Sequence, residues 1–135
     1  MSSYVEKYSW IPGGPLYRRF TYAFIHKDLW HLAMNAIVFL LLFSLQGLII
    51  FFISIPLCTL FTRRSVVGAS GAIVAMGSFW MIQHHFQYLL IATALYSAIA
   101  ARFDHRSGIH HLSHFLGAIY GIIFFIFVAW IENSM

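Results

Sequence analysis

Residues 66–83 read "VVGASGAIVAMGSFWMIQ", a stretch without a charged side chain near the middle of the chain. Small residues, Gly68, Ser70, Gly71 and Gly77, recur in it among larger apolar ones. In membranes a stripe of small residues usually marks two helices in close contact. A serine between glycines can also serve as a nucleophile, and this stretch alone does not decide between packing and chemistry.

The rest of the chain shares this apolar character. It has 135 residues, of which 61% are hydrophobic and 9% are charged, whereas roughly 25% of an ordinary soluble domain is charged. Its mean hydropathy is +0.80. The composition therefore predicts a single-domain protein embedded in the lipid bilayer. The net charge of +4 rests on too few side chains to form a basic face, so we expect no nucleic-acid partner.

Charged residues bound three long uncharged stretches, which contain 34, 37 and 25 residues. Because one spanning helix needs roughly 17–25 apolar residues, the last stretch predicts one span and each of the others predicts two. The breaks are expected at Gln46-Gly47 and within "QHHFQ" (83–87). We thus predict an all-α integral membrane protein, a bundle of about five transmembrane helices over residues 29–135. The expected spans are 29–46, 48–62, 66–83, 86–101 and 107–131, after an interfacial leader loop over residues 1–28. One long tilted helix over 29–62 is the alternative to the first two spans.

Polar side chains stand at the start of the first expected span. Such residues inside apolar spans are costly and often functional. "HKDLWHLAMN" (26–35) places His31 and Asn35 four residues apart, on one face of a helix. His26 lies just before that helix. Taken alone, these residues are also typical of polar side chains that complete a helix start.

A second polar group opens the last expected span. In "HHLSHFLGAIYG" (110–121), His114, Gly117 and Gly121 share one helical face. The two glycines form a GxxxG seam, which lets a neighbouring helix approach closely. If that neighbour is the small-residue stripe of the third span, His114 meets Ser70.

Alternation of the spans brings these groups to one side of the membrane. The first, third and fifth spans all begin on the N-terminal side, so His31, Ser70 and His114 lie at a similar depth. Unpaired N–H groups at the helix N-terminus would stabilise an oxyanion formed at Ser70. This agreement in depth favours chemistry over packing alone. His110 and His111 lie nearer the loop, and we expect them to be solvated.

The pieces together resemble the rhomboid family of intramembrane serine proteases. They are "YRRFTYAFIHKDLWHLAMN" (17–35), "GASGAI" (68–73) and "SHFLGAIYG" (113–121), in the order of the family. The resemblance covers the chain from about Tyr17 to Ile131, and its combination of HxxxN, GxSG and HxxGxxxG is specific. The family's common core has six spans, and this chain has counterparts of the last five. We expect either a fragment or a minimal five-span form.

The resemblance implies a Ser–His dyad. Ser70 would be the nucleophile, and His114 the general base that later protonates the leaving amine. His31 and Asn35 would donate hydrogen bonds to the oxyanion, with help from the Ser70 backbone N–H. Asp104, the acid nearest to His114 in the sequence, receives no role because the family works as a dyad.

The resemblance also implies structural residues near the site. Gly68 would permit the tight loop before the nucleophile, and Gly71 would keep the oxyanion site open. Gly117 and Gly121 would pack the last span on the third. Arg18 matches an aromatic–Arg pair that is structural in the family.

The family's substrates are single-spanning transmembrane proteins, cut in or near their membrane segment. The resemblance therefore implies a multi-pass protein, expected in a bacterial inner membrane, without metal or cofactor. Val74 stands where the family commonly carries an aromatic ring stacked on the histidine, so packing support for His114 must come from elsewhere or be weaker. A catalytically inactive rhomboid-like protein that binds transmembrane clients is the alternative function. A third hypothesis is a helical membrane protein whose motifs only pack.

The sequence leaves the orientation in the membrane open. All eight Lys and Arg residues fall on the side of the N-terminus, which the positive-inside rule assigns to the cytoplasm. The family opens its active site on the opposite, outer side.

Overall fold

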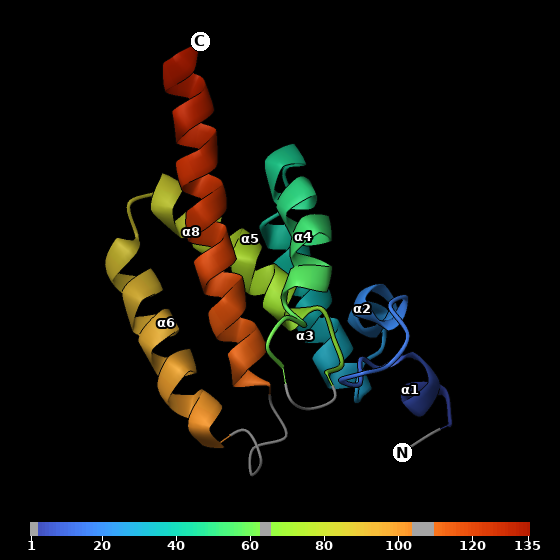
Figure 1. Cartoon of the computed structure of the whole chain (residues 1–135). Coiled ribbons are helices and arrows are strands. Elements are labelled where there is room, and N and C mark those ends of the chain that lie inside the picture. Colours follow the sequence, from blue (N-terminus) through green and yellow to red (C-terminus); the bar gives the residue numbers. More distant parts are fainter. Residues whose placement is uncertain (1–2, 63–65, 104–109) are drawn as a thin grey trace.

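The computed structural model describes residues 3–62, 66–103 and 110–135, and its regular elements are helices (Figure 1). Within these residues the β-type pairing is limited to an isolated antiparallel bridge between Trp10 and Val66. The all-α prediction is therefore confirmed for the described part of the chain. The elements are α1 (Ser3–Tyr8), α2 (Arg18–Thr21), the 3-10 helix η1 (Tyr22–Phe24), α3 (Leu29–Leu41), α4 (Leu45–Leu57), α5 (Ser70–Gln83), α6 (Gln87–Ala100), the 3-10 helix η2 (Ala101–Phe103) and α8 (His111–Ser134).

The first uncharged stretch folds as two helices, so the alternative of one long helix over 29–62 is wrong. Ser44 is the N-cap of α4, and its hydroxyl accepts a hydrogen bond from the Gly47 N–H at 2.9 Å. A capping serine satisfies an N–H group that the helix itself leaves without an acceptor. The break therefore precedes Ser44, and the predicted break at Gln46-Gly47 is wrong because both residues lie in the first turn of α4.

The second stretch breaks where it was predicted to break. α5 ends at Gln83 and α6 begins at Gln87, so "QHHFQ" provides the connection. His85 in this connection has a φ of 64°, in the left-handed region that ends a helix and redirects the chain.

The helices are shorter than the expected spans. α3, α4, α5 and α6 have 13 or 14 residues, and each extends about 20 Å, less than the roughly 30 Å of a bilayer's hydrocarbon core. α8 has 24 residues, and among the helices of the described ranges it alone is long and apolar enough to cross a membrane. Capping turns and connecting loops occupy the ends of the stretches that hydropathy assigned to spans.

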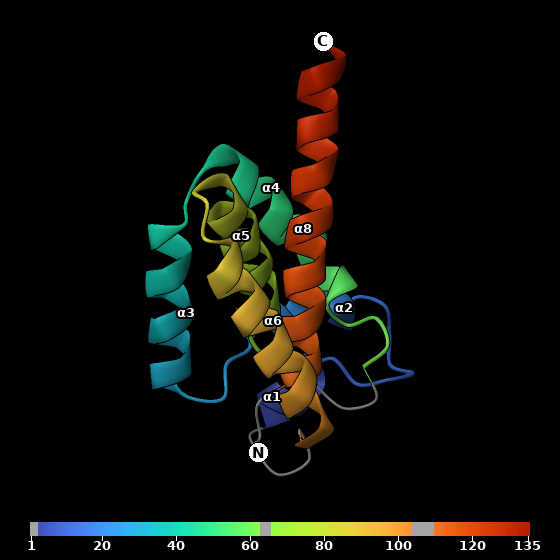
Figure 2. The same cartoon turned by 90° about the vertical axis from the view of Figure 1, so that its left-hand side faces the viewer.

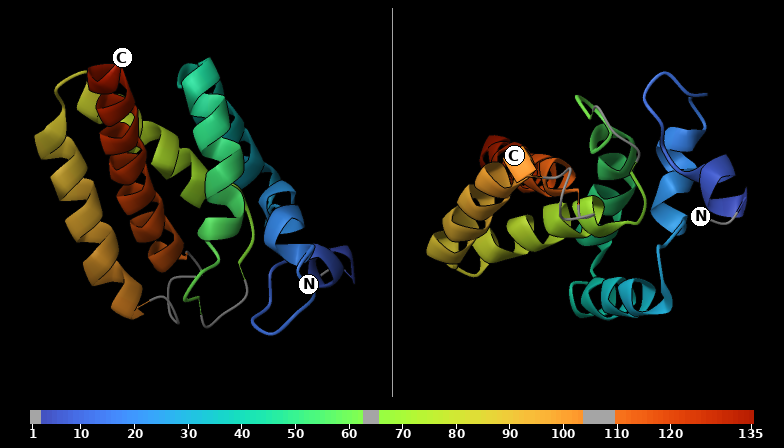
Figure 3. Two further views of the ribbon diagram at one scale, coloured as in Figure 1. Left: turned by 45° about the horizontal axis from the view of Figure 1, so that its top comes forward. Right: turned by 90° about the horizontal axis from the view of Figure 1, so that it is seen from below.

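α5 is the central helix of the bundle. Its most extensive contact is with α8 and the next is with α4, whereas α3 touches it only briefly. Figures 1 and 2 show α3, α5 and α8 rising from the same end of the molecule, with α4 and α6 running the other way. Figure 3 shows α5 crossing α8 obliquely. The N-termini of three helices thus lie toward one end of the bundle.

Within the leader predicted over residues 1–28, residues 3–28 include short helices and pack on the bundle. Trp10 exchanges two backbone hydrogen bonds with Val66, at 3.0 and 2.9 Å. The Tyr22 hydroxyl donates to the carbonyl of Ile55 in α4 at 2.6 Å. Trp10 and Tyr22 belong to the same buried cluster as core residues of α4 and α5. The leader therefore shares a core with the helices and fixes the loop that enters α5.

Candidate active site

The side chains of Ser70 and His114 meet where α5 and α8 cross. Ser70 is the first residue of α5, and His114 lies in the first turn of α8. The Oγ of Ser70 is 2.8 Å from Nε2 of His114, which is within the hydrogen-bond reach that a base needs to activate a serine hydroxyl. The tertiary structure thus joins two residues 44 positions apart in the sequence.

Gly68 sets the geometry with which the chain enters α5. Its φ of +86° lies in the left-handed region that glycine adopts without steric strain. Its N–H donates to the carbonyl of Tyr22 at 2.9 Å, so the leader holds this loop. Ser70 lies two residues later at the helix N-terminus, where the first N–H groups have no intrahelical acceptor and the helix dipole favours negative charge. Gly68 therefore has a backbone conformation that residues with a side chain rarely adopt.

Glycines bring the backbones of α5 and α8 into contact. A Cβ added to Gly117 would collide with the carbonyl oxygen of Gly71, and one added to Gly121 would lie 2.5 Å from the carbonyl oxygen of Ala75. No real side-chain carbon fits at such distances, so both α8 glycines are required for this crossing. His114 lies one turn before Gly117, and the crossing carries its ring to the start of α5.

Gly71 faces α8. The atoms nearest to a Cβ built on Gly71 belong to Ser113 and to Cys58, whose sulfur would be 3.1 Å away. Gly71 therefore has a packing role in the structure, and its expected role at the oxyanion site stays a prediction. The missing side chain makes room for Ser113 and so for the first turn of α8.

His31 and Asn35 lie against the loop that precedes Ser70. A Cβ built on Gly68 would be 2.7 Å from Cε1 of His31 and 3.6 Å from Nδ2 of Asn35. Both side chains project from α3, whose N-cap Asp28 accepts the backbone N–H of His31 at 2.7 Å. The structure thus brings both predicted oxyanion donors to a point two residues before Ser70.

His26 is a residue of this site to which the sequence assigned no role. Its Nε2 lies 3.1 Å from Nδ2 of Asn35, and its ring meets the His31 ring edge-on at a centroid distance of 5.2 Å. Burial lowers the pKa of His26 and the neighbouring His31 lowers it further, while a backbone hydrogen bond with Phe24 opposes both. Proximity to the HxxxN helix was the available sequence signal. The loop conformation that turns the ring back onto α3 leaves no periodic trace in the sequence.

His111 is buried, so the expectation that it is solvated is wrong. It is 6% exposed, and its ring packs edge-on against Tyr96 of α6 at 5.6 Å and against His114 at 5.9 Å. Aromatic contacts of this geometry contribute about 0.5–1.5 kcal/mol. His111 thus supplies a ring contact for His114 of the kind that Val74 cannot provide. Its position near a helix start gave no indication that α6 covers it.

Arg18, to which the resemblance gives a structural role, is the first residue of α2. Its Cδ would lie 3.6 Å from a Cβ on Gly14. The next residue, Arg19, ties the leader to the end of α4. It donates to Oγ1 of Thr59 at 3.1 Å, and its guanidinium lies 4.5 Å from the centroid of the Trp10 ring.

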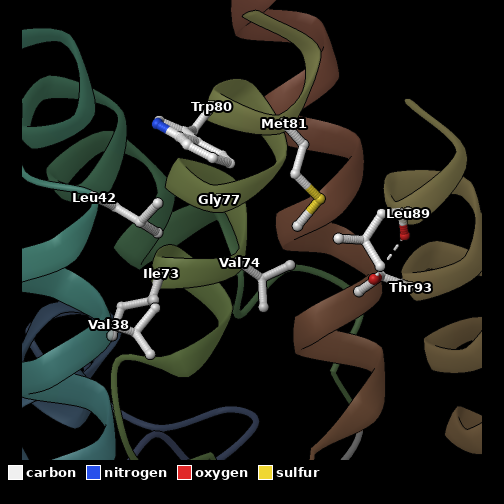
Figure 4. A pocket seen from close by; sticks show the side chains of 9 residues that line it. All are labelled: Val38, Leu42, Ile73, Val74, Gly77, Trp80, Met81, Leu89 and Thr93. Carbon is white, nitrogen blue, oxygen red and sulfur yellow. Dashed lines mark hydrogen bonds between the residues drawn. The ribbon is translucent and has the colours of Figure 1, made fainter. Parts of the chain in front are cut away.

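An apolar pocket of about 270 Å³ opens between α3 and α6, with α5 as its floor (Figure 4). Ile73 and Val74 in this floor follow Ser70 by three and four residues, so they share its face of α5. The single hydroxyl in the lining belongs to Thr93 and donates to the carbonyl of Leu89 at 2.9 Å. The pocket therefore suits an apolar occupant. Its lining residues are Val38, Leu42, Ile73, Val74, Gly77, Trp80, Met81, Leu89 and Thr93.

Two further features bear on the chemistry of the site. Asp104, the acid nearest to His114 in the sequence, lies outside the described residues. In the part of the chain that the structure describes, no group of three or more His, Cys, Asp or Glu side chains is arranged to hold a metal ion.

No protein-family model, curated protein or solved structure matches this chain. The functional conclusion therefore rests on the residues of the site and their geometry.

Proposed function

We propose that the protein is an intramembrane serine endopeptidase of the rhomboid type. The observation that carries this proposal is the distance of 2.8 Å between Oγ of Ser70 and Nε2 of His114. In the proposed reaction Ser70 attacks the carbonyl carbon of the substrate while His114 takes the hydroxyl proton. His114 then gives that proton to the leaving amine, and a water molecule hydrolyses the acyl-enzyme by the same route.

We assign the oxyanion to the space between α3 and the N-terminus of α5. His31 and Asn35 supply the side-chain donors, and the backbone N–H of Ser70 supplies a third. This assignment is supported by the position of both side chains against Gly68. In soluble serine proteases the loss of one such donor reduces turnover by about 10²–10³.

The proposed substrates are transmembrane segments of single-spanning proteins, cleaved by a protein that itself crosses the bilayer several times. Large apolar side chains on the outer faces of the helices support a lipid environment, among them Leu41, which is 77% exposed, and Leu45, which is 75% exposed. The short helices would be accommodated by local thinning of the bilayer. In this proposal an apolar segment enters at the pocket between α3 and α6, whose lining includes Ile73, three residues after Ser70. The segment must then unwind to present its carbonyl to Ser70.

A fluorophosphonate probe tests the proposal directly. The full chain in detergent micelles is expected to be labelled at Ser70, and Ser70→Ala and His114→Ala are each expected to abolish labelling. Ser78→Ala, a matched change of a buried serine on the same helix, is expected to leave labelling intact. Labelling that survives Ser70→Ala would overturn the assignment of the nucleophile. Cleavage of a single-spanning substrate in proteoliposomes then tests the substrate class.

A catalytically inactive protein that binds transmembrane clients is the second candidate. The apolar pocket favours it, because such a surface binds a helix without any need for Ser70 or His114. Client proteins that co-purify uncleaved, and equally with Ser70→Ala, would favour this candidate over the protease.

A further inference from the structure

We infer that His26 is a positioning residue that holds the Asn35 side-chain amide with its Nδ2 toward the loop of the nucleophile. This inference rests on the proposed function, because it assigns Asn35 to the oxyanion. Its starting point is geometric. Nδ2 of Asn35 lies 3.1 Å from Nε2 of His26, and the same nitrogen would lie 3.6 Å from a Cβ at Gly68.

The second hydrogen bond of the His26 ring determines which nitrogen carries the proton. A backbone hydrogen bond with Phe24 favours the protonated ring, as expected when a carbonyl accepts from a ring N–H. Since Nε2 faces Asn35, Nδ1 is the nitrogen left for that carbonyl. A neutral imidazole with its proton on Nδ1 presents Nε2 as an acceptor. Asn35 must then offer an N–H, and not its carbonyl oxygen, to His26.

The amide group of Asn35 has two N–H bonds, and His26 uses one of them. The second N–H remains on the same nitrogen and is available to the oxyanion. If Nε2 of His26 were a donor, the amide would turn over and present its oxygen at that place. An oxygen there repels the negative charge that develops on the substrate. The tautomer of His26 therefore decides whether Asn35 stabilises the oxyanion or opposes it.

The surroundings of His26 favour the neutral ring. The His26 ring faces the ring of His31 on α3, with centroids 5.2 Å apart. Two positively charged rings at that distance would repel each other. The nearby Asp28 carboxylate is engaged with the backbone N–H of His31. His26 thus acts by accepting a hydrogen bond, without itself exchanging protons with the substrate.

A spectroscopic experiment tests this inference without any need for activity. The full-length Ser70→Ala protein, with ¹⁵N in its His and Asn side chains, is prepared in detergent micelles. The ring shifts assigned to His26 are expected to show a proton on Nδ1 at pH 7.5. The side-chain NH₂ signal of Asn35 is expected to move in His26→Ala and to return toward its original position in His26→Gln, which restores an acceptor. A proton on Nε2, or an Asn35 signal that ignores both substitutions, would overturn the inference.

Kinetics supply the second test. His26→Ala is expected to lower kcat about tenfold and to change KM little. This loss is smaller than the loss expected from removing an oxyanion donor, because Asn35 is displaced and not removed. His26→Gln is expected to recover most of that loss, and the exposed Lys27→Ala serves as the control. In an Asn35→Ala background, His26→Ala should lower kcat little further. A full additional tenfold fall in kcat would contradict coupling through Asn35. If the unaltered protein has no activity, the proposed function fails while the spectra still decide the role of His26.

Discussion

The two halves of the candidate site are built differently. Ser70 and His114 lie on α5 and α8, whose backbones touch at glycines along the crossing. His31 and Asn35 lie on α3, a helix without a buried residue that contacts α5 only briefly. The pocket opens on the α3 side of α5. The proposed nucleophile and base therefore belong to a closely packed half, and the proposed oxyanion donors to an open one.

This difference suggests how the site could combine precision with access. Local stability follows the density of packed contacts, so α5 and α8 should hold the Ser70–His114 distance rigidly. α3 has fewer contacts to lose, so in the proposed function it is the helix that would shift to admit an apolar segment. In the proposed reaction, the contacts of His31 and Asn35 with the loop at Gly68 would then have to re-form before the oxyanion develops.

The largest effect is expected from breaking the packed half with Gly117→Ala. The new Cβ would collide with the carbonyl oxygen of Gly71, and overpacking of this kind costs about 1–3 kcal/mol or more. We expect a lower midpoint of thermal unfolding in micelles and loss of probe labelling at Ser70. The matched control is Gly77→Ala, whose Cβ would meet Leu42 at an ordinary 3.5 Å and should leave both measurements unchanged or improved. Equal destabilisation by the two variants would contradict a special role for the α5–α8 crossing.

A smaller effect is expected from filling the open half with Gly77→Leu. A leucine at this position would occupy the pocket between Leu42 and Met81. We expect cleavage of a transmembrane substrate to fall about tenfold, mainly through KM, a size typical of a change in a hydrophobic pocket. Labelling of Ser70 by the small fluorophosphonate should stay within about twofold, because the dyad lies on the other half. If labelling and cleavage fell together, the pocket would not be a separate substrate path.

The smallest effect is expected from pH, which should change stability through His26, a residue that precedes α3 in the chain. Its folded-state pKa is lowered from the ordinary 6.5, first by burial and then by His31. Below pH 6.5 the unfolded chain binds a proton at His26 that the folded chain resists, so this residue makes stability fall as the pH drops toward the folded pKa. Thermal midpoints at pH 7.5 and pH 5.5 should differ less for His26→Gln than for the unaltered protein. An equal difference in thermal midpoint for both proteins would exclude His26 as the source of this pH dependence.

Much of the fold could be predicted from local pattern, and each failed prediction has its own physical reason. Hydropathy located α3, α4, α5, α6 and α8, and the polar "QHHFQ" marked the turn between α5 and α6 correctly. The turn before α4 was misplaced because the Ser44 cap carries less signal than a glycine. Hydropathy also overestimated helix lengths, since apolar residues continue into caps and loops. Burial of His111 was missed because it depends on Tyr96 of another helix.

The sequence by itself determined which segments are apolar, where small residues form a seam, and which polar side chains share a helical face. These properties repeat with the period of the helix, so they can be read without knowing any neighbour. Only the tertiary structure decided that Oγ of Ser70 lies 2.8 Å from Nε2 of His114. It also decided that Gly71 makes room for the first turn of α8 and that His26 contacts Asn35. Those results depend on how helices cross and how the leader closes over a loop. Such distances arise between segments far apart in the chain, where no local period records them.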